Sequence, residues 1–239
     1  MSNKICIVIS HYLGRDNRDL INLINQLDFF KSNLIVSVND DNALSESYSN
    51  INGVNFVVRP NIGMNIGGWG AAIKYCQDYD KIIFMQDECI IKDFDFISQY
   101  SDLLDNIGAG IVGESINPKW NKSWDLLANS PLNYNVETLE GLTIPRVENY
   151  IQCLNKWGIN PGKTGLHLRS LVWAFNTSFL SIINNFPIGL NKEECIAVEI
   201  GVNKLVEQNN LKILQSATYP FRYIQHKEWK TDGWSKILL

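Results

Sequence analysis

The chain has 239 residues, of which 45% are hydrophobic and 19% are charged. This composition is typical of a globular protein with one large domain, or one domain with an added lobe, and it excludes disordered and fibrous classes. The net charge of −4 argues against a nucleic-acid-binding protein. The five cysteines have no CxxC spacing, which favours reduced thiols over a disulfide framework or a zinc site.

No segment has the pattern of a secretion signal or a membrane span. A strand-like run begins at residue 5 with no basic region or cleavage site before it. No run approaches the ~18 apolar residues that a spanning helix needs. We therefore expect a cytoplasmic protein.

The amino-terminal half alternates short apolar runs with amphipathic segments. The strands are predicted at residues 5–10, 34–38, 54–58, 81–85 and 110–113, and the helices at 16–30, 69–77 and 94–104. This alternation predicts an α/β protein with a mostly parallel sheet and helices on both faces.

A glycine-rich stretch separates the third and fourth predicted strands. Pro60 ends the third strand, because proline donates no hydrogen bond within a sheet and disfavours helical geometry at Arg59. The glycines that follow are Gly63, Gly67, Gly68 and Gly70. We expect a turn whose N–H groups, together with the positive end of the next helix, could bind phosphate.

Polar side chains follow four of the predicted strands. They are Ser10, His11, Asn39, Asp40, Asp41, Arg59, Gln86, Asp87 and Glu88. The carboxyl ends of parallel strands meet at one edge of a sheet, so these groups should lie within reach of one elongated ligand. The alternative is that polar residues simply end each strand.

The acidic pair after the fourth strand, Asp87 and Glu88, could also hold a divalent metal. Mg²⁺ and Mn²⁺ prefer carboxylate oxygens and bridge readily to a diphosphate. A solvated acidic loop is the alternative interpretation of the same two residues.

The carboxyl-terminal half begins with a segment that has little periodicity. Residues 117–164 contain one predicted helix, at 145–157, and should form a lobe or cover. The elements predicted after it are strands at 166–175 and 211–214 and helices at 178–184 and 193–208. We expect two halves, 1–116 and 117–239, within one continuous domain. Tryptophans of the lobe could stack on an acceptor sugar or form a small core.

Glu199 lies on the apolar face of the helix predicted at residues 193–208. At a period of about 3.6 residues it shares a stripe with Cys195 and Val202, and no cation lies three or four positions away. Burial without a partner would raise the pKa of its carboxyl group, as a general base near neutral pH requires. The alternative is a structural acid bonded to the backbone or to a distant arginine such as Arg169 or Arg222.

Two features of the carboxyl-terminal segment could bind ligands. His226 lies close to Arg222 and could contact a metal or a diphosphate. Residues 225–239 interleave lysines with tryptophans, a pattern that suits an anionic membrane interface. Docking of this tail onto the parent domain is the alternative.

The order of these parts resembles the GT-A family of nucleotide-sugar glycosyltransferases, especially the inverting enzymes that build bacterial capsules and other surface polysaccharides. The sequences RPN at 59–61 and NIGG at 65–68 look like the segment before the family's DxD strand, and residues 82–88 look like that strand. Residues 193–214 look like the helix with the catalytic acid and the strand after it. The resemblance covers residues 4–113 and 166–226 and leaves the middle lobe unmatched.

The resemblance implies a donor site along the sheet edge. The residues that would line the nucleotide are Ser10, His11, Asn39, Asp40 and Asp41, and those near the ribose and diphosphate are Arg59, Asn65 and Gly68, with Gln86 and Asp87 beside them. The family's catalytic base matches Glu199, although Glu193 and Glu194 stay open as alternatives.

The resemblance also implies a site for Mn²⁺ or Mg²⁺. Glu88 matches the last acid of DxD, and His226 matches the metal-ligand histidine of some members. Gln86 departs from the pattern, because it stands where the first acid is expected. Either Asp87 takes over that role, or metal binding is weakened, or no metal is needed.

The implied reaction moves a sugar from a nucleotide-diphosphate donor to a hydroxyl group of a glycan or lipid-linked acceptor, and we expect the tail to contact the inner face of the membrane. A base removes the hydroxyl proton, the oxygen attacks the anomeric carbon, and a cation with helix N–H groups stabilises the leaving diphosphate. Direct displacement would invert the anomeric centre.

Three other functions compete with this interpretation. A dinucleotide-dependent oxidoreductase lacks support because its glycines belong after the first strand, where only Gly14 is present. A sugar nucleotidyltransferase would need a glycine- and arginine-rich loop at the same place. A catalytically inactive module that binds a sugar or a partner is the third alternative, and Gln86 is its main support.

Overall fold

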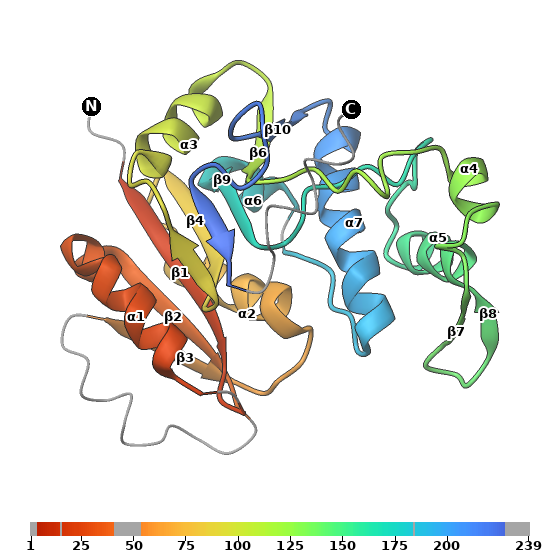
Figure 1. The fold of residues 1–239 in the computed structure, drawn as a ribbon, viewed down its shortest axis with the longest axis horizontal. Coiled ribbons are helices and arrows are strands. Elements are labelled where there is room, and N and C mark those ends of the chain that lie inside the picture. Colours follow the sequence, from red (N-terminus) through yellow and green to blue (C-terminus); the bar gives the residue numbers. More distant parts are fainter. Residues whose placement is uncertain (1–3, 15, 41–53, 184, 228–239) are drawn as a thin grey trace.

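A computed structural model describes residues 4–14, 16–40, 54–183 and 185–227 of the chain. Its centre is a seven-stranded sheet (Figure 1). In order across the sheet, the strands are β10 (Lys212–Gln215), β6 (Ala109–Gly113), β9 (Val172–Asn176), β4 (Lys81–Gln86), β1 (Ile5–Tyr12), β2 (Leu34–Asn39) and β3 (Asn55–Arg59). Every pairing is parallel except those of β9 with β4 and β6. The predicted α/β class with a mostly parallel sheet is confirmed.

Helices cover both faces of the sheet. Along β1, Ile7 and Ile9 pack into a core with α1 (Arg18–Gln26) and α3 (Phe96–Asp105). Cys6 and Val8 point the other way, into a core with α2 (Met64–Ala72), α6 (Thr177–Ile183) and α7 (Lys192–Gln208). Since successive side chains of a strand point to opposite faces, the continuous apolar run of β1 fills both cores.

Two short 3₁₀ helices complete this part of the chain. They are η1 (Asp28–Asn33), which follows α1, and η3 (Ile73–Tyr75), which follows α2. The helix predicted at residues 16–30 is therefore divided into α1 and η1.

The middle segment forms a lobe beside α7, to the right of the sheet in Figure 1. It contains α4 (Trp124–Ala128), the hairpin of β7 (Asn135–Glu137) with β8 (Thr143–Pro145), and α5 (Arg146–Lys156). Trp120 and Trp124 are buried in its core, which also includes Ala197 and Ile200 of α7. These two tryptophans therefore have a structural role, while the predicted division at residue 116 stays a prediction.

A small antiparallel sheet, which the sequence analysis missed, joins distant parts of the chain. It pairs β5 (Cys89–Ile91) with β11 (Ile224–His226), and His226 lies opposite Cys89. This pairing brings the carboxyl-terminal segment to the end of β4.

The sequence predicted that the glycines form a turn before the helix. This is wrong for Gly67 and Gly68, because α2 begins at Met64 and contains both of them. Gly63 has a φ of 78° and forms the amino-terminal cap of the helix. A Cβ atom on Gly68 would lie 3.3 Å from the Ser10 Cβ atom. The glycines thus allow a helix to pack closely on the sheet, which outweighs their low helix propensity.

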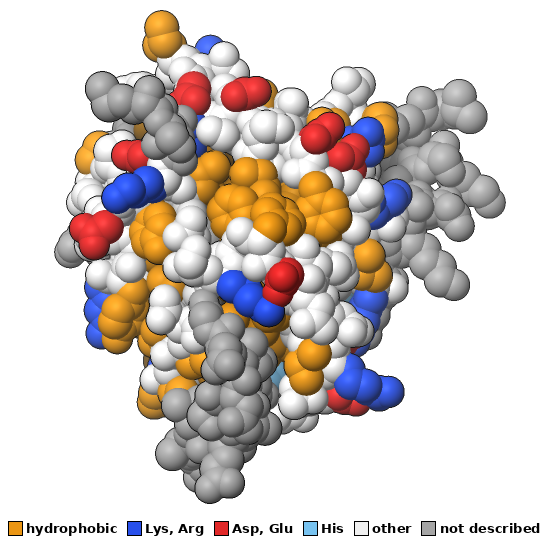
Figure 2. Space-filling view, turned by 90° about the vertical axis from the view of Figure 1, so that its left-hand side faces the viewer, with side chains coloured by type: hydrophobic (Ala, Val, Ile, Leu, Met, Phe, Trp, Pro, Cys, Tyr) orange, Lys and Arg blue, Asp and Glu red, His pale blue; other side chains and the backbone are white. Residues whose placement is uncertain are grey.

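The described surface carries some exposed apolar side chains. Figure 2, which views the molecule from the left-hand side of Figure 1, shows hydrophobic side chains grouped near the centre of that face. The exposed apolar residues include Phe29 and Phe94, whose ring centroids lie 5.6 Å apart. Among the described residues, no helix is long and apolar enough to cross a membrane.

Candidate active site

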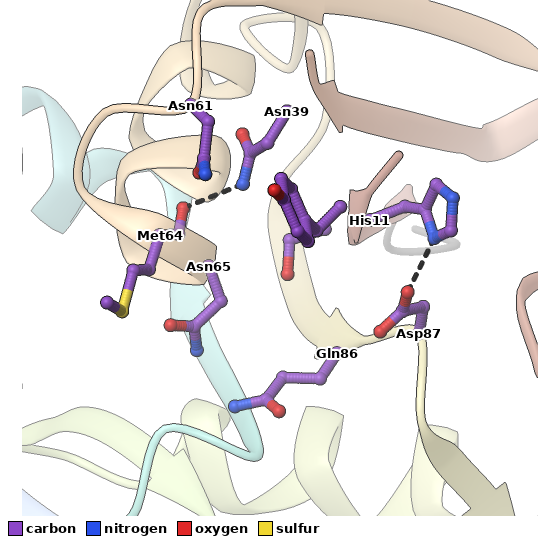
Figure 3. A pocket seen from close by; sticks show the side chains of 9 residues that line it. His11, Asn39, Asn61, Met64, Asn65, Gln86 and Asp87 are labelled. Atoms are coloured by element: carbon purple, nitrogen blue, oxygen red, sulfur yellow. Dashed lines mark hydrogen bonds and ion pairs between the residues drawn. The ribbon is translucent and has the colours of Figure 1, made fainter. Parts of the chain in front are cut away.

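A cavity of about 360 Å³ opens at the carboxyl ends of β1, β2 and β4. Figure 3 shows the side chains that line it. They are Ser10, His11, Tyr12, Asn39, Asn61, Met64, Asn65, Gln86 and Asp87. Tyr12, Asn61 and Met64 were not among the predicted site residues, although each lies next to or near one of them in the chain. Their contribution depends on how α2 and β1 pack, which a linear pattern does not reveal.

His11 and Asp87 form a buried pair between the ends of β1 and β4. The His11 Nδ1 atom lies 2.5 Å from Asp87 Oδ2, and both side chains are almost fully buried. In Figure 3 the His11 ring is turned toward Asp87 and away from Asn65 and Gln86. The pair therefore joins two strand ends and holds the Asp87 carboxylate in place at the cavity wall.

Asn39 and Arg59 support the opposite wall of the cavity. The Arg59 Nη1 atom donates to Asn39 Oδ1 over 2.7 Å, and Asn39 Nδ2 donates to the Met64 carbonyl over 3.0 Å. Arg59 Nη2 also donates to the Ile62 carbonyl, and burial lowers the pKa of the Arg59 guanidinium. These bonds fix the start of α2 relative to β2 and β3.

The other predicted donor-site residues occupy different environments. Asp40 is buried, and its backbone N–H donates to the Arg59 carbonyl over 2.8 Å. Gly68 is buried against Ser10 and does not line the cavity. Asp41 lies outside the described residues.

The predicted metal-binding residues meet beside the small sheet. The His226 Nε2 atom lies 3.2 Å from Glu88 Oε2, and both residues are buried. Lys227 Nζ lies 3.3 Å from the other Glu88 oxygen. Because Mg²⁺ ligands lie at 2.0–2.1 Å, two adjacent ligands of an octahedral ion are about 3 Å apart. Glu88 and His226 therefore have a spacing that fits two ligands of one divalent ion.

The protein offers only part of a coordination shell at this place. No group of three or more His, Cys, Asp or Glu side chains suited to a metal occurs in the described part of the chain. Asp87, the neighbouring acid, is bonded to His11. An ion held by Glu88 and His226 would thus complete its shell with water and with oxygen atoms of a ligand such as a diphosphate.

Glu199 projects from α7 toward the segment that precedes β9. Its Oε1 atom accepts a hydrogen bond from the Ser170 backbone N–H group. Of the two interpretations that the sequence left open, the structure therefore has the acid bonded to the backbone, through a group from another part of the chain. The Glu199 charge also acts on His167, whose pKa is lowered by burial and raised to a lesser extent by that charge.

The alternative acids of α7 are engaged elsewhere. Glu193 accepts hydrogen bonds from Arg146 Nε at 3.0 Å and from the Tyr150 hydroxyl at 2.6 Å, within the lobe. Glu194 accepts from the Leu190 N–H group over 2.8 Å in the first turn of the helix. Both acids lie in the first turn of α7, where negative charge complements the helix dipole.

Gln86 and Asn65 converge on the residue that contacts Glu199. The Gln86 Nε2 atom donates to the Ser170 carbonyl over 2.7 Å, and Asn65 Nδ2 donates to the same oxygen over 3.0 Å. In Figure 3 these two side chains extend toward one another from β4 and α2. Ser170, which no sequence signal indicated, therefore links the cavity to Glu199.

Comparison with known proteins gives a similarity of structure and none of sequence. No protein-family model matches the chain, and no curated protein sequence matches it. The chain is similar in structure to the mannosyltransferase PcManGT from Pyrobaculum calidifontis, solved with GDP-Man and Mn²⁺, with a TM-score of 0.54 and 10% identity. The match covers 90% of this chain and 55% of the mannosyltransferase, so the chain spans about half of that protein's length.

A second similar structure is glucosyl-3-phosphoglycerate synthase from Mycobacterium tuberculosis. Its complex with Mn²⁺, UDP-glucose and phosphoglyceric acid matches with a TM-score of 0.52 and 14% identity, over 97% of this chain and 74% of the synthase. Its complex with Mg²⁺ and UDP has the same TM-score and 13% identity. At these identities the similarity concerns the fold. The chain has the GT-A fold, as expected from the order of its predicted elements.

Proposed function

We propose that this protein is a glycosyltransferase that moves a sugar from a nucleotide diphosphate to a hydroxyl group of a glycan or lipid-linked acceptor in surface polysaccharide synthesis. The observation that carries this proposal is a side-chain arrangement on the GT-A fold. The Glu88–His226 pair lies at the tip of β4, at the end of the strand that also lines the cavity. Glu199 is connected to the same strand end through Ser170.

The residues around the cavity suit a nucleotide. Tyr12 is 44% exposed at the end of β1 and offers an aromatic face to a base. Asn61 and Asn65 add polar groups near the start of α2, where helix N–H groups favour a phosphate. We expect the base near Tyr12 and the diphosphate between α2 and the β4 tip.

Divalent metal binding is part of the proposal. Glu88 and His226 would hold Mn²⁺ or Mg²⁺, which when bound would neutralise charge on the leaving diphosphate. Lys227 Nζ, which pairs with Asp19, also lies 3.3 Å from the same carboxylate. His11 holds the carboxylate of Asp87, the residue before Glu88, in a fixed orientation at the end of β4.

Glu199 is the proposed general base. It would accept the proton of the acceptor hydroxyl group, and that oxygen would attack the anomeric carbon with inversion. The Ser170 N–H group holds one oxygen of this carboxylate, and the other oxygen is the proposed proton acceptor. Since α7 also forms part of the lobe core, the lobe is well placed to contribute to the acceptor side.

The proposed cellular place is the cytoplasm, with contact to the inner face of the membrane through the tail. Residues 228–239 of that tail lie outside the described part of the chain. Flotation of the full chain with anionic vesicles tests this contact, and a chain that stays at the bottom of the gradient contradicts it.

Nucleotide titration tests the proposed function directly. We expect UDP, GDP or dTDP to raise the melting temperature, more strongly with Mn²⁺ than without, because a ligand at 100 times its Kd stabilises the folded state by about 2.7 kcal/mol. Stabilisation by NAD and by none of the three diphosphates would end the transferase proposal. A screen of nucleotide sugars for transfer or hydrolysis then identifies the donor.

A catalytically inactive sugar-binding module is the second candidate. It is favoured by Gln86, whose amide is bonded to a carbonyl group where the family pattern has an acid. Binding of a nucleotide sugar without any turnover across the acceptor screen would support this candidate over the enzyme.

A further inference from the structure

Side chains of other residues form hydrogen bonds with both backbone groups of Ser170, its carbonyl oxygen and its N–H group. Its carbonyl oxygen accepts from Gln86 Nε2 at 2.7 Å and from Asn65 Nδ2 at 3.0 Å. Its N–H group donates to the Glu199 carboxylate. The three side chains come from β4, α2 and α7, so one residue joins the cavity lining to the proposed base.

The backbone around Ser170 is anchored at both neighbours as well. The Arg169 N–H group donates to the Ser115 carbonyl over 2.9 Å, and the Leu171 carbonyl accepts from the Gln86 N–H group over 3.1 Å. Peptide units are planar, so only the φ and ψ angles of Ser170 separate its fixed carbonyl from its N–H group. Because the bonds of the neighbouring Arg169 and Leu171 backbone groups restrict these two angles, the bonds to the Ser170 carbonyl help to set the direction in which its N–H group points.

The chemistry of a carbonyl group explains why residue 86 is a glutamine. A carbonyl oxygen only accepts hydrogen bonds, so the group that faces it must be a donor. The Gln86 amide meets this requirement, whereas an ionised carboxylate at residue 86 would place negative charge against the Ser170 oxygen. The departure from an acidic first position thus has a physical reason that is separate from metal binding.

We propose that Gln86 is a positioning residue, which orients the Glu199 carboxylate through Ser170 and so couples the donor cavity to the base. This inference rests on the proposed function for its effect on transfer, but the positioning itself is a property of the structure. Asn65 acts on the same carbonyl and should share the role to a smaller degree, because its bond is longer.

The test uses Gln86→Met, which keeps the side-chain length and removes the donor. The matched control is Gln99→Met, because Gln99 Nε2 also donates to a backbone carbonyl, that of Ser216 at 3.2 Å, away from the cavity. We expect Gln86→Met to lower kcat by about 10-fold to 100-fold, since a misplaced catalytic group costs that much, and to leave the donor KM within about 3-fold. Gln99→Met should change neither constant.

A second readout is independent of turnover. The amide resonance of Ser170 in a ¹H–¹⁵N spectrum reports the hydrogen bond from its N–H group to the Glu199 carboxylate. The Glu199→Gln variant shows in which direction this chemical shift moves when that bond is altered. Gln86→Met should move this resonance, and Gln99→Met should not. If Gln86→Met fails to fold, Asn65→Ala replaces it in the measurement of the Ser170 resonance alone, because it removes the other donor to the Ser170 carbonyl.

The possible results separate the two proposals. A raised donor KM with unchanged kcat would make Gln86 a donor contact and overturn the positioning role, as would an unmoved Ser170 resonance. If the wild-type protein transfers no sugar, the proposed function fails, and the Ser170 resonance alone decides whether Gln86 positions Glu199. A lower kcat together with a moved resonance supports both proposals.

Discussion

The Glu88 carboxylate lies 3.2 Å from the His226 imidazole although 138 positions separate the two residues in the chain. The pairing of β5 with β11 produces this contact, because it places His226 opposite Cys89, the residue after Glu88. Neither residue alone indicates a metal site. Their spacing is the observation that supports the proposed metal site.

Replacement of Glu88 by alanine should remove the effect of metal on nucleotide binding. In the wild type we expect Mn²⁺ to tighten binding of a nucleotide diphosphate by about 10-fold, or ~1.4 kcal/mol, and in Glu88→Ala this ratio should approach one. Calorimetric titration with and without Mn²⁺ measures both values. The control is Glu148→Ala, at an exposed position on α5. An unchanged Mn²⁺ response in Glu88→Ala would transfer the metal role to Asp87 or remove it.

Glu199→Gln should separate catalysis from binding. The amide oxygen can still accept from the Ser170 N–H group, so the local structure should remain, but the side chain can no longer take a proton. We expect kcat to fall by about 10² to 10⁴, the usual contribution of a general base, with the Kd of the nucleotide diphosphate unchanged. Steady-state kinetics and calorimetry measure the two effects. Retained turnover would shift the role to Glu193 or Glu194.

His167 should make stability depend on pH. Burial lowers the pKa of this imidazole below its usual value of 6.5. Its Nδ1 atom lies 2.8 Å from the Gly165 carbonyl, which only accepts, so Nδ1 carries the proton of the neutral ring. Below about pH 6.5 the unfolded chain binds a proton that the folded protein does not. Stability is therefore fully present above that pH and decreases as the pH falls through it.

The slope from this single group is at most about 1.4 kcal/mol per pH unit. Urea unfolding between pH 7.5 and 5.5 measures it, and His167→Asn should flatten the profile because the titrating group is gone. An equally steep profile in the variant would assign the slope to other groups.

The sequence predicts the strands of the sheet well because each strand is marked by a pattern of neighbouring residues. Each parallel strand is a short apolar run between turn residues, as in residues 34–38, where the structure has β2 (Leu34–Asn39). Strand β9 begins at Val172, later than the predicted start at residue 166, because residues 166–171 bond to the β4 tip and to other segments. The three-residue strand β11 carries no periodic signal of its own and depends on its partner β5.

The site was harder to predict because it depends on backbone groups. Periodicity indicated that Glu199 faces an apolar environment, but it could not show that the Ser170 N–H group reaches the carboxylate. In the same way the sequence presents Gln86 as a missing metal ligand, whereas in the structure its amide bonds to the Ser170 carbonyl. Side-chain chemistry can be read from the sequence, whereas bonds to distant backbone groups require the fold.

The close packing of α2 on its preceding loop predicts different effects for two helical glycines. A Cβ atom on Gly67 would lie 2.2 Å from the Ile62 carbonyl oxygen, which also accepts from Arg59 and cannot move freely. Gly67→Ala should therefore destabilise the protein by about 1–3 kcal/mol and weaken nucleotide binding, since the start of α2 must shift.

Gly201→Ala in α7 is the matched control for this variant. The nearest atom to its new Cβ would be the end of the flexible Leu154 side chain, at 3.0 Å. Alanine also gains about 1 kcal/mol over glycine in a helix interior, so the two effects should nearly cancel. Urea unfolding of both variants measures the difference. Equal stabilities would show that the loop at Ile62 yields easily, and that the Arg59 contacts do not fix the wall of the cavity.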